Sequence, residues 1–156
     1  MIGFGFDVHK LASGESLVLG GVTLESKLGT VAHSDGDVLI HAIMDALLGA
    51  CSLGDIGLHF PDTDLRYKNA NSIALLREVR DLITQEGARI VNIDSTVVIE
   101  APRLRPHIDS MRETIAQALG LTTKQVSIKA TTNERLGFIG REEGVAAYAV
   151  CQLERE

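Results

Sequence analysis

The sequence predicts an α+β sandwich, in which helices pack on one face of a mainly four-stranded mixed sheet and a small hairpin lies near the N-terminus. Two observations favour this class. Three segments carry apolar residues at helical spacing, and several short stretches between them are rich in valine and isoleucine. A length of 156 residues is within the usual range for one domain, so we expect a single domain, residues 1–156, with one hydrophobic core.

The first third of the chain predicts strands followed by a helix. Residues 1–8 are expected to form a strand, and residues 16–24 carry two apolar triplets around Gly20-Gly21, which predicts a hairpin. Residues 27–37 are polar and contain glycine, so we expect a loop.

A helix is predicted from Gly36 or Asp37 to about Cys51, with Ser34 and Asp35 as candidate N-caps. The stretch 54–64 that follows is rich in glycine, aspartate and proline, which predicts another loop.

The second half alternates helices with strands. We expect a helix from near Asn71 to Gly87, a strand over 90–100, and a third helix with Pro106 in its first turn that ends before Gly120. Alternating apolar and polar residues then predict a half-buried strand over 126–131.

The last predicted strand, residues 145–153, is apolar on both faces. Such a strand is normally covered on both sides, here by helices or by another subunit. An oligomer is therefore expected.

Composition excludes several classes of protein. There are 21 acidic residues against 15 lysines and arginines, and no basic cluster, so the chain is not expected to bind nucleic acid. Cys51 and Cys151 form no C-x-x-C motif and are expected to be buried in a reducing compartment. The longest apolar stretch, residues 38–51, is too short to span a membrane. We expect no membrane partner and a cytoplasmic location.

Polar residues on the first predicted helix are the most informative feature. Asp37, His41 and Asp45 are spaced four residues apart and so form one stripe. One interpretation is an internal Asp–His pair that satisfies a half-buried histidine. The alternative is that His41 binds a metal ion while a neighbouring carboxylate orients its ring.

A second cluster lies in the first strand. In extended backbone Asp7 and His9 point to the same side, so both can bind one ion while Val8 faces the core. Together with His41 they supply two imidazoles and a carboxylate, the ligand count of a catalytic zinc site with an open fourth position.

Three loops carry candidate ligand-binding groups. His33-Ser34-Asp35-Gly36 leads into a helix N-terminus, which favours anions. Residues 54–57 and 60–64 supply carboxylates and turn residues, and a solvated turn is the alternative there. In the segment 130–134 that ends a strand, Glu134 can hold a harder ion such as Mg²⁺.

Motifs of several other enzyme classes are missing. The sequence has no G-x-S-x-G elbow, no P-loop and no Rossmann fingerprint. A covalent serine or cysteine mechanism therefore has no support, and metal-assisted chemistry on a phosphorylated small molecule fits the remaining features.

Six motifs occur in one order along the chain: Gly5-Phe6-Asp7-Val8-His9, Ala32-His33-Ser34-Asp35-Gly36-Asp37, Asp45-Ala46-Leu47-Leu48-Gly49-Ala50, Gly54-Asp55-Ile56-Gly57, Phe60-Pro61-Asp62-Thr63-Asp64, and Lys129-Ala130-Thr131-Thr132 through Gly144. Together they closely resemble the 2-C-methyl-D-erythritol 2,4-cyclodiphosphate synthase family, from Ile2 to about Leu153. The resemblance implies a homotrimer with active sites between subunits. It also implies that the 2-phosphate of 4-diphosphocytidyl-2-C-methyl-D-erythritol 2-phosphate attacks the β-phosphorus and expels CMP, in the non-mevalonate isoprenoid pathway.

The resemblance also implies roles for residues. Asp7, His9 and His41 would bind zinc, and Glu134 would contact a second divalent ion, Mg²⁺ or Mn²⁺. Catalytic positions would be His33 and Thr132. Residues around the metal and methylerythritol portion of the substrate would be Asp7, Val8, His9, His33, Ser34, Asp55, Ile56, Gly57, Phe60, Pro61, Asp62, Thr63 and Asp64. Residues around the cytidine diphosphate would be Ile99, Glu100, Ala101, Pro102, Arg103, Leu104, Arg105, Thr131, Thr132, Asn133 and Glu134.

Phe138, Arg141 and Glu143 resemble residues near the trimer axis, where some members of the family hold an isoprenoid diphosphate. Two other functions stay open on the metal residues alone. One is a zinc-dependent phosphohydrolase, in which water is the nucleophile. The other is a trimeric carrier of an isoprenoid diphosphate with structural zinc, although a structural site usually has four protein ligands and only three are nominated.

Overall fold

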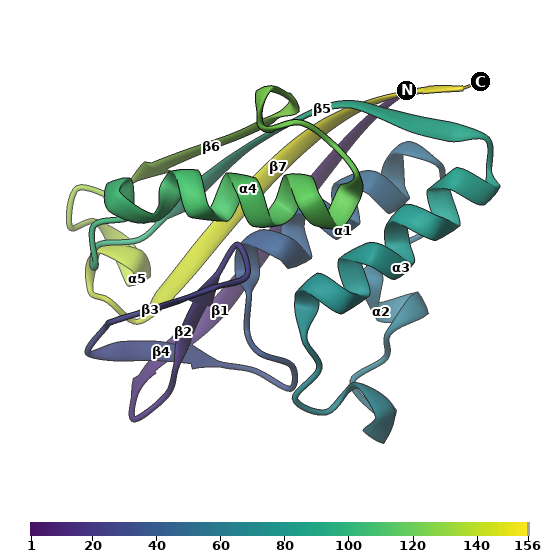
Figure 1. Cartoon of the computed structure of the whole chain (residues 1–156). Helices are drawn as coiled ribbons and strands as arrows, with labels where there is room; N and C mark the ends of the chain where they lie inside the picture. Colours follow the sequence, from purple (N-terminus) through teal and green to yellow (C-terminus); the bar gives the residue numbers. More distant parts are fainter. Residues whose placement is uncertain (156) are drawn as a thin grey trace.

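The computed structural model describes residues 1–155 and contains a five-stranded mixed sheet in the order β4-β1-β7-β5-β6 (Figure 1). Its strands are β1 (Ile2–Ser13), β4 (Leu28–Val31), β5 (Ala88–Val98), β6 (Val126–Thr131) and β7 (Gly144–Arg155). The hairpin strands are β2 (Leu17–Leu19) and β3 (Val22–Leu24). The helices are α1 (Val38–Ala50), α2 (Ile56–His59), α3 (Ser72–Gln85), α4 (Ile108–Leu119) and α5 (Gly137–Gly140).

The α+β class, the hairpin and the four strands β1, β7, β5 and β6 are confirmed, with α1, α3 and α4 on one side of the sheet (Figure 1). The expected loop over residues 27–37 is partly wrong, because Leu28–Val31 forms a fifth strand, β4. β4 pairs antiparallel with residues 10–13, by which β1 extends beyond its expected end at residue 8. A four-residue strand depends on this distant partner, and its own composition gives no such signal.

Two local predictions also differ from the structure. Asp37, and neither Ser34 nor Asp35, caps α1, because its carboxylate accepts a hydrogen bond from the amide of Ile40 at 3.1 Å. The expected loop over 54–64 contains α2, whose first turn is capped by Asp55. α5, which was not expected, is also a single short turn.

α1 lies directly against β1, and two glycines make this approach possible. A Cβ atom on Gly3 would lie 1.8 Å from the carbonyl oxygen of Ala46, and one on Gly5 would lie 1.9 Å from that of Ala42. Any larger residue at either position would push the helix away. The backbone contact therefore sets the distance from His41 on α1 to the residues that follow Gly5 on β1.

The opposite face of the sheet is open in the single chain, and its β5 and β6 part carries the ion pair of Asp94 and Lys129. The part formed by β1 and β7 is apolar, with exposed Ile2, Phe4, Phe6, Val8, Tyr148 and Val150. In the single chain the last strand is covered on one side, whereas Tyr148 and Val150 on the other side are 41% and 45% exposed, so its cover by another subunit stays a prediction. Within residues 1–155, no helix is both long enough and apolar enough to cross a membrane.

Candidate metal centre and substrate cavities

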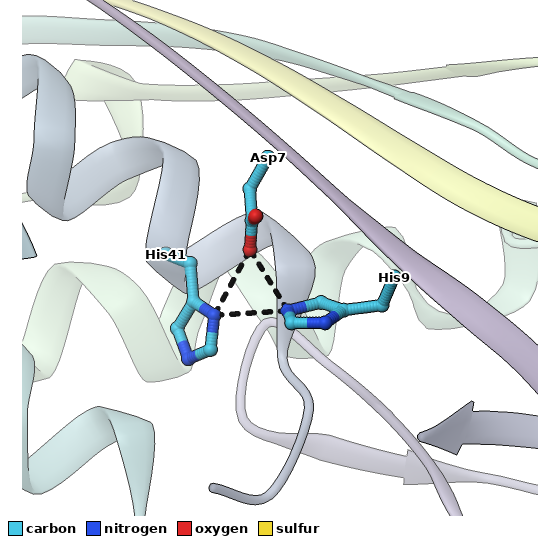
Figure 2. Close-up of side chains that lie close together, drawn as sticks. All are labelled: Asp7, His9 and His41. Carbon is cyan, nitrogen blue, oxygen red and sulfur yellow. Dashed lines mark hydrogen bonds and ion pairs between the residues drawn. The ribbon is translucent and has the colours of Figure 1, made fainter. Parts of the chain in front are cut away.

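Asp7, His9 and His41 point toward one another from β1 and α1 (Figure 2). The Oδ2 atom of Asp7 lies 2.8 Å from Nε2 of His9 and 3.0 Å from Nδ1 of His41. The two imidazole nitrogens are themselves 3.1 Å apart. Side chains alternate along β1, and α1 packs closely against this strand. Together these two features bring together the three metal ligands that the sequence predicts.

The three contacts cannot all be ordinary hydrogen bonds of neutral imidazoles. Each of the three atoms faces the other two, and a ring nitrogen carries at most one hydrogen. A cation among them would accept all three lone pairs at once. Tetrahedral zinc bonds of 2.0–2.1 Å would separate the ligand atoms by roughly 3.3 Å, close to the distances here. The donor set therefore fits a metal ion.

Electrostatics in the cluster favour an ionised Asp7. Burial raises its pKa, but hydrogen bonds and charges from His41 and His9 outweigh burial, so the pKa lies well below its ordinary value. For His41, burial lowers the pKa, whereas the hydrogen bond and charge of Asp7 raise it more. The site thus places one ionised carboxylate beside two imidazoles, a donor set suited to a cation.

The far side of the His41 ring faces two hydroxyls. Its Nε2 atom lies 3.0 Å from Oγ of Ser72 and 3.2 Å from Oγ of Ser34. Ser72 is fully buried and donates its hydroxyl to Asp35, 2.5 Å away. Ser72 was missed in the sequence, where the first residue of a helix beside an Asn cap carries no signal of a role at a site.

The expectation that a carboxylate of the stripe on α1 orients His41 is wrong, because neither Asp37 nor Asp45 contacts its ring. The carboxylate of Asp37 accepts hydrogen bonds from the amides of Gly20 at 3.0 Å and Gly21 at 2.7 Å. Asp45 accepts one from the amide of Ile56 at 2.8 Å. Asp37 fastens the hairpin turn and Asp45 fastens α2.

A cavity of about 480 Å³ opens beside the cluster. Its lining consists of Asp7, His9, Val31, Ala32, His33, Ser34, His41, Ile56, Gly57, Phe60, Pro61, Asp62 and Thr63. The Nε2 atom of His33 is buried and has no hydrogen-bond partner among the described residues. A buried polar atom without a partner is rare in a folded protein, and a ligand is one group that can supply the partner.

Three residues expected near this cavity are directed elsewhere. The side chain of Val8 is 41% exposed on the open face of the sheet, so the expectation that it faces the core is wrong. Asp64 caps the turn Leu65–Tyr67 and is paired with Arg66, 2.6 Å away. One oxygen of Asp55 accepts the amide of Leu58 at 2.9 Å, which leaves less of this carboxylate for a ligand.

A second cavity of about 510 Å³ lies at the end of β5 and β6. It is lined by Ile99, Glu100, Pro102, Arg103, Leu104, Arg105, Ile108, Ile128, Lys129, Ala130, Thr131 and Thr132. These residues include most of the expected cytidine segment. The two cavities share no lining residue, so the expected site residues that line a cavity fall into two separate groups.

The loop after β6 is held by Glu100. Its Oε1 atom accepts the amides of Asn133 at 2.9 Å and Arg135 at 3.2 Å. Glu134, between them, has a φ of 53°, a left-handed conformation that non-glycine residues adopt rarely. The carboxylate of Glu100 thus stabilises the unusual backbone that presents Glu134.

The residues expected near a trimer axis lie where β7 begins. Arg141 and Glu143 form an exposed ion pair of 3.2 Å, and Phe138 is 45% exposed. Phe138 also packs within 3.0 Å of the position that a Cβ atom on Gly144 would take. The three side chains are accessible in the single chain.

Comparisons with known proteins agree with the sequence resemblance. The sequence model of the YgbB family matches residues 1–154. The chain is 59% identical over 153 residues to the 2-C-methyl-D-erythritol 2,4-cyclodiphosphate synthase of Symbiobacterium thermophilum, covering 98% of both chains. It is 57% identical over 152 residues to that of Pseudomonas aeruginosa, covering 97% of both. A solved 2C-methyl-D-erythritol-2,4-cyclodiphosphate synthase with bound CDP has a TM-score of 0.91 and 37% identity, over 99% of this chain and all of that one.

Proposed function

This chain belongs to the YgbB family, and from that premise we infer that it catalyses the cyclisation for which its relatives are named. It converts 4-diphosphocytidyl-2-C-methyl-D-erythritol 2-phosphate to 2-C-methyl-D-erythritol 2,4-cyclodiphosphate and CMP, in the non-mevalonate isoprenoid pathway. Identity of 57–59% over nearly the full length carries this conclusion. The chain also contains a three-residue cluster that can hold a metal ion.

The reaction itself explains why no nucleophile-activating pair of side chains is needed. The attacking group is a phosphate monoester, which carries a charge of about −1.5 to −2 at neutral pH. A P–O bond forms from the 2-phosphate to the β-phosphorus, the bond to the α-phosphate breaks, and its electrons leave with CMP. The obstacle is repulsion: two unit charges 4 Å apart repel by about 4 kcal/mol at an effective dielectric constant of 20.

We assign the metal-binding roles as follows. Asp7, His9 and His41 hold zinc, and Glu134 contacts a second ion, Mg²⁺ or Mn²⁺. Bound there, the ions supply positive charge that offsets the repulsion and polarises the phosphoryl group. Asp7, kept ionised by its two histidines, provides the negative charge that retains a cation in this recess.

His33 and Thr132 are assigned to the reacting phosphates. The free Nε2 atom of His33 can donate a hydrogen bond to a phosphate oxygen in the first cavity. The hydroxyl of Thr132 accepts the amide of Glu134 at 3.3 Å and lines the second cavity. Both residues act by holding the substrate for in-line attack.

We assign the methylerythritol portion of the substrate to the first cavity and the cytidine portion to the second. Ile56, Gly57 and the segment 60–63 form one wall of the first cavity. Ile99, Pro102 and Leu104 give the second cavity apolar surface for a base, while Arg103 adds positive charge and Lys129 is ion-paired with Asp94. Such a division of apolar and cationic groups suits a nucleoside diphosphate.

A homotrimer with sites between subunits accounts for the two separate cavities. A substrate that contacts the metal cluster and the cytidine segment can bridge two chains, one supplying each cavity. The open apolar face of β1 and β7 supplies surface for such an assembly. Phe138 and Arg141 would then lie near the axis, where an isoprenoid diphosphate is a candidate ligand. A cytoplasmic location completes the proposal.

Phosphorus-31 NMR tests the proposal directly. The zinc-loaded protein with Mg²⁺ is incubated with the substrate, beside a sample treated with EDTA. Cyclic diphosphate and CMP that disappear on chelation would support both the reaction and its metal dependence. A linear diphosphate would identify a hydrolase, and no turnover by a trimer that retains zinc would favour a carrier.

A further inference from the structure

We propose that Ser72 and Asp35 are positioning residues that fix the ring orientation and the tautomer of His41, so that its Nδ1 lone pair faces the metal ion. The inference rests on the proposed metal-binding role of His41. It concerns the side of the ring that faces away from Asp7 and His9.

The three side chains form an unbroken line of hydrogen bonds. Nε2 of His41 lies 3.0 Å from Oγ of Ser72, and Oγ of Ser72 lies 2.5 Å from Oδ1 of Asp35. The other oxygen of Asp35 accepts the backbone amide of Ser72 at 2.8 Å. Asp35 therefore grips Ser72 by both its hydroxyl and its amide, which leaves the hydroxyl one direction for its proton.

The chemistry of the groups sets the direction of each bond. An ionised carboxylate only accepts, so the Ser72 hydroxyl donates to Asp35. The lone pairs of Ser72 are then left to accept the N–H of His41 at Nε2. A neutral imidazole carries one proton, so Nδ1 is left as a bare lone pair directed at Asp7 and His9. Metal binding requires this tautomer.

Ser34 is a weaker partner for the same nitrogen. Its hydroxyl is 3.2 Å from Nε2 and accepts the amide of Gly36 at 3.3 Å, both longer than the contacts of Ser72. Ser34 also lines the first cavity, whereas Ser72 is fully buried. Ser72 is therefore the permanent partner of His41, and the hydroxyl of Ser34 stays accessible to a ligand.

Asp35 is itself held in place from several sides. Its Oδ1 atom accepts the amide of Asp37 at 3.2 Å, and its own amide donates to the carbonyl of Ala70 at 3.1 Å. The neighbouring amide of Asn69 donates to the carbonyl of His33 at 2.8 Å. This strap between residues 33–35 and the start of α3 makes the line from Asp35 to His41 rigid.

Zinc affinity of the full-length Ser72→Ala protein tests the proposal, measured by competition with a chromophoric chelator. We expect the affinity to fall by roughly 10- to 100-fold, as for other partners of metal-binding histidines. The visible spectrum of the Co²⁺ form should change as well, because the His41 ring is free to rotate. Ser72→Thr keeps the hydroxyl and should restore most of the affinity.

Ser95→Ala is the matched control. Ser95 is equally buried at 2% exposure and donates to the carbonyl of Ser127, away from the cluster. It should lose stability without losing zinc affinity. An equal loss in Ser95→Ala, or unchanged affinity and spectrum in a folded Ser72→Ala, would overturn the proposal. Absence of zinc from the wild-type protein would instead overturn the proposed metal role, and the proposal with it.

Asp35→Asn provides a second route should Ser72→Ala not fold. Three donors converge on the Asp35 carboxylate, and an amide offers only one accepting oxygen, so this variant must lose its bond either to the hydroxyl or to the backbone amide of Ser72, and its grip on Ser72 is weakened. We expect weaker zinc binding in this variant too. Wild-type affinity in Asp35→Asn would contradict the proposal.

Discussion

The Oε1 atom of Glu100 accepts the backbone amide of Asn133, 2.9 Å away, across 33 positions of sequence. Glu100 was expected at the cytidine pocket, and it does line the second cavity. Its carboxylate nevertheless points at the loop that carries Glu134. Glu100 therefore links the second cavity to this loop.

Replacing Glu100 by Ala should loosen this loop. Two hydrogen bonds to a charged acceptor are lost, each worth about 1 kcal/mol at an exposed position. We expect a higher Mg²⁺ requirement and faster hydrogen exchange at the amides of Asn133 and Arg135. Glu100→Gln, whose amide oxygen can accept both bonds, should stay near wild type. Equal behaviour of the two variants would remove this role.

His41→Ala should abolish metal binding at the cluster. We expect zinc content and turnover each to fall by roughly 100-fold or more, beyond the usual effect of losing a hydrogen-bond partner of a ligand. Elemental analysis and the phosphorus-31 assay measure the two quantities. His107→Ala, a histidine outside the cluster, controls for non-specific zinc. Survival of both quantities in His41→Ala would show that the ligand assignment is wrong.

Glu134→Gln should raise the Mg²⁺ requirement and leave zinc content unchanged. Loss of one anionic ligand should shift the Mg²⁺ dependence of activity by roughly tenfold, which corresponds to about 1.4 kcal/mol. Glu142→Gln, another exposed carboxylate in a left-handed conformation, is the control. Identical Mg²⁺ titrations for wild type and Glu134→Gln would show that Glu134 does not bind the second ion.

Asp37 should make stability depend on pH. Burial raises its pKa to about 6 from 3.8, against the hydrogen bonds of Gly21, Ile40 and Gly20. The folded protein thus holds this proton more tightly than the unfolded chain. This contribution to the free energy of unfolding is complete below pH 3.8 and is lost as pH rises to about 6, a change of about 3 kcal/mol.

Urea unfolding of wild type and Asp37→Asn, at one protein concentration and several pH values, isolates this effect. The uncharged amide does not titrate. As pH rises from 4 to 6, the unfolding free energy of the wild type should therefore fall relative to that of Asp37→Asn. Loss of one accepting oxygen adds a constant offset only. A difference independent of pH would contradict the prediction.

Phe6→Glu should dissociate the proposed trimer. Phe6 is 44% exposed on the open sheet face, where its ring packs 5.1 Å from that of Tyr148, and a buried charge there is unfavourable. Sedimentation analysis should give three chains for wild type and one for the variant. Glu78→Lys, on the exposed side of α3, should leave the mass unchanged. A monomeric wild type, or an intact trimer in Phe6→Glu, would count against the proposed interface.

Periodic and local patterns made most of the fold predictable. The helices α3 and α4 begin and end close to Asn71, Pro106 and Gly120, because caps and apolar spacing are written in neighbouring residues. β4 escaped prediction because its pairing with β1 joins residues that are 15 to 21 positions apart. The sequence contains no local signal for that contact.

The same distinction holds at the site. The alternation of β1 was enough to pair Asp7 with His9, and the polar stripe on the first predicted helix added His41 as the third ligand. The sequence could not reveal that Asp37 bonds to Gly20 and Gly21, or that Ser72 takes the place expected for a carboxylate beside His41. Both depend on contacts between elements that only the folded chain brings together.

The seating of α1 on Gly3 and Gly5 has a consequence for how the protein tolerates change. Since backbone meets backbone there, no side chain acts as a spacer between the strand and helix that bear the cluster. Substitutions elsewhere in the core can therefore alter stability while the gap between Asp7 and His41 stays constant. Other core residues can be substituted widely, but Gly3 and Gly5 leave no room even for a methyl group.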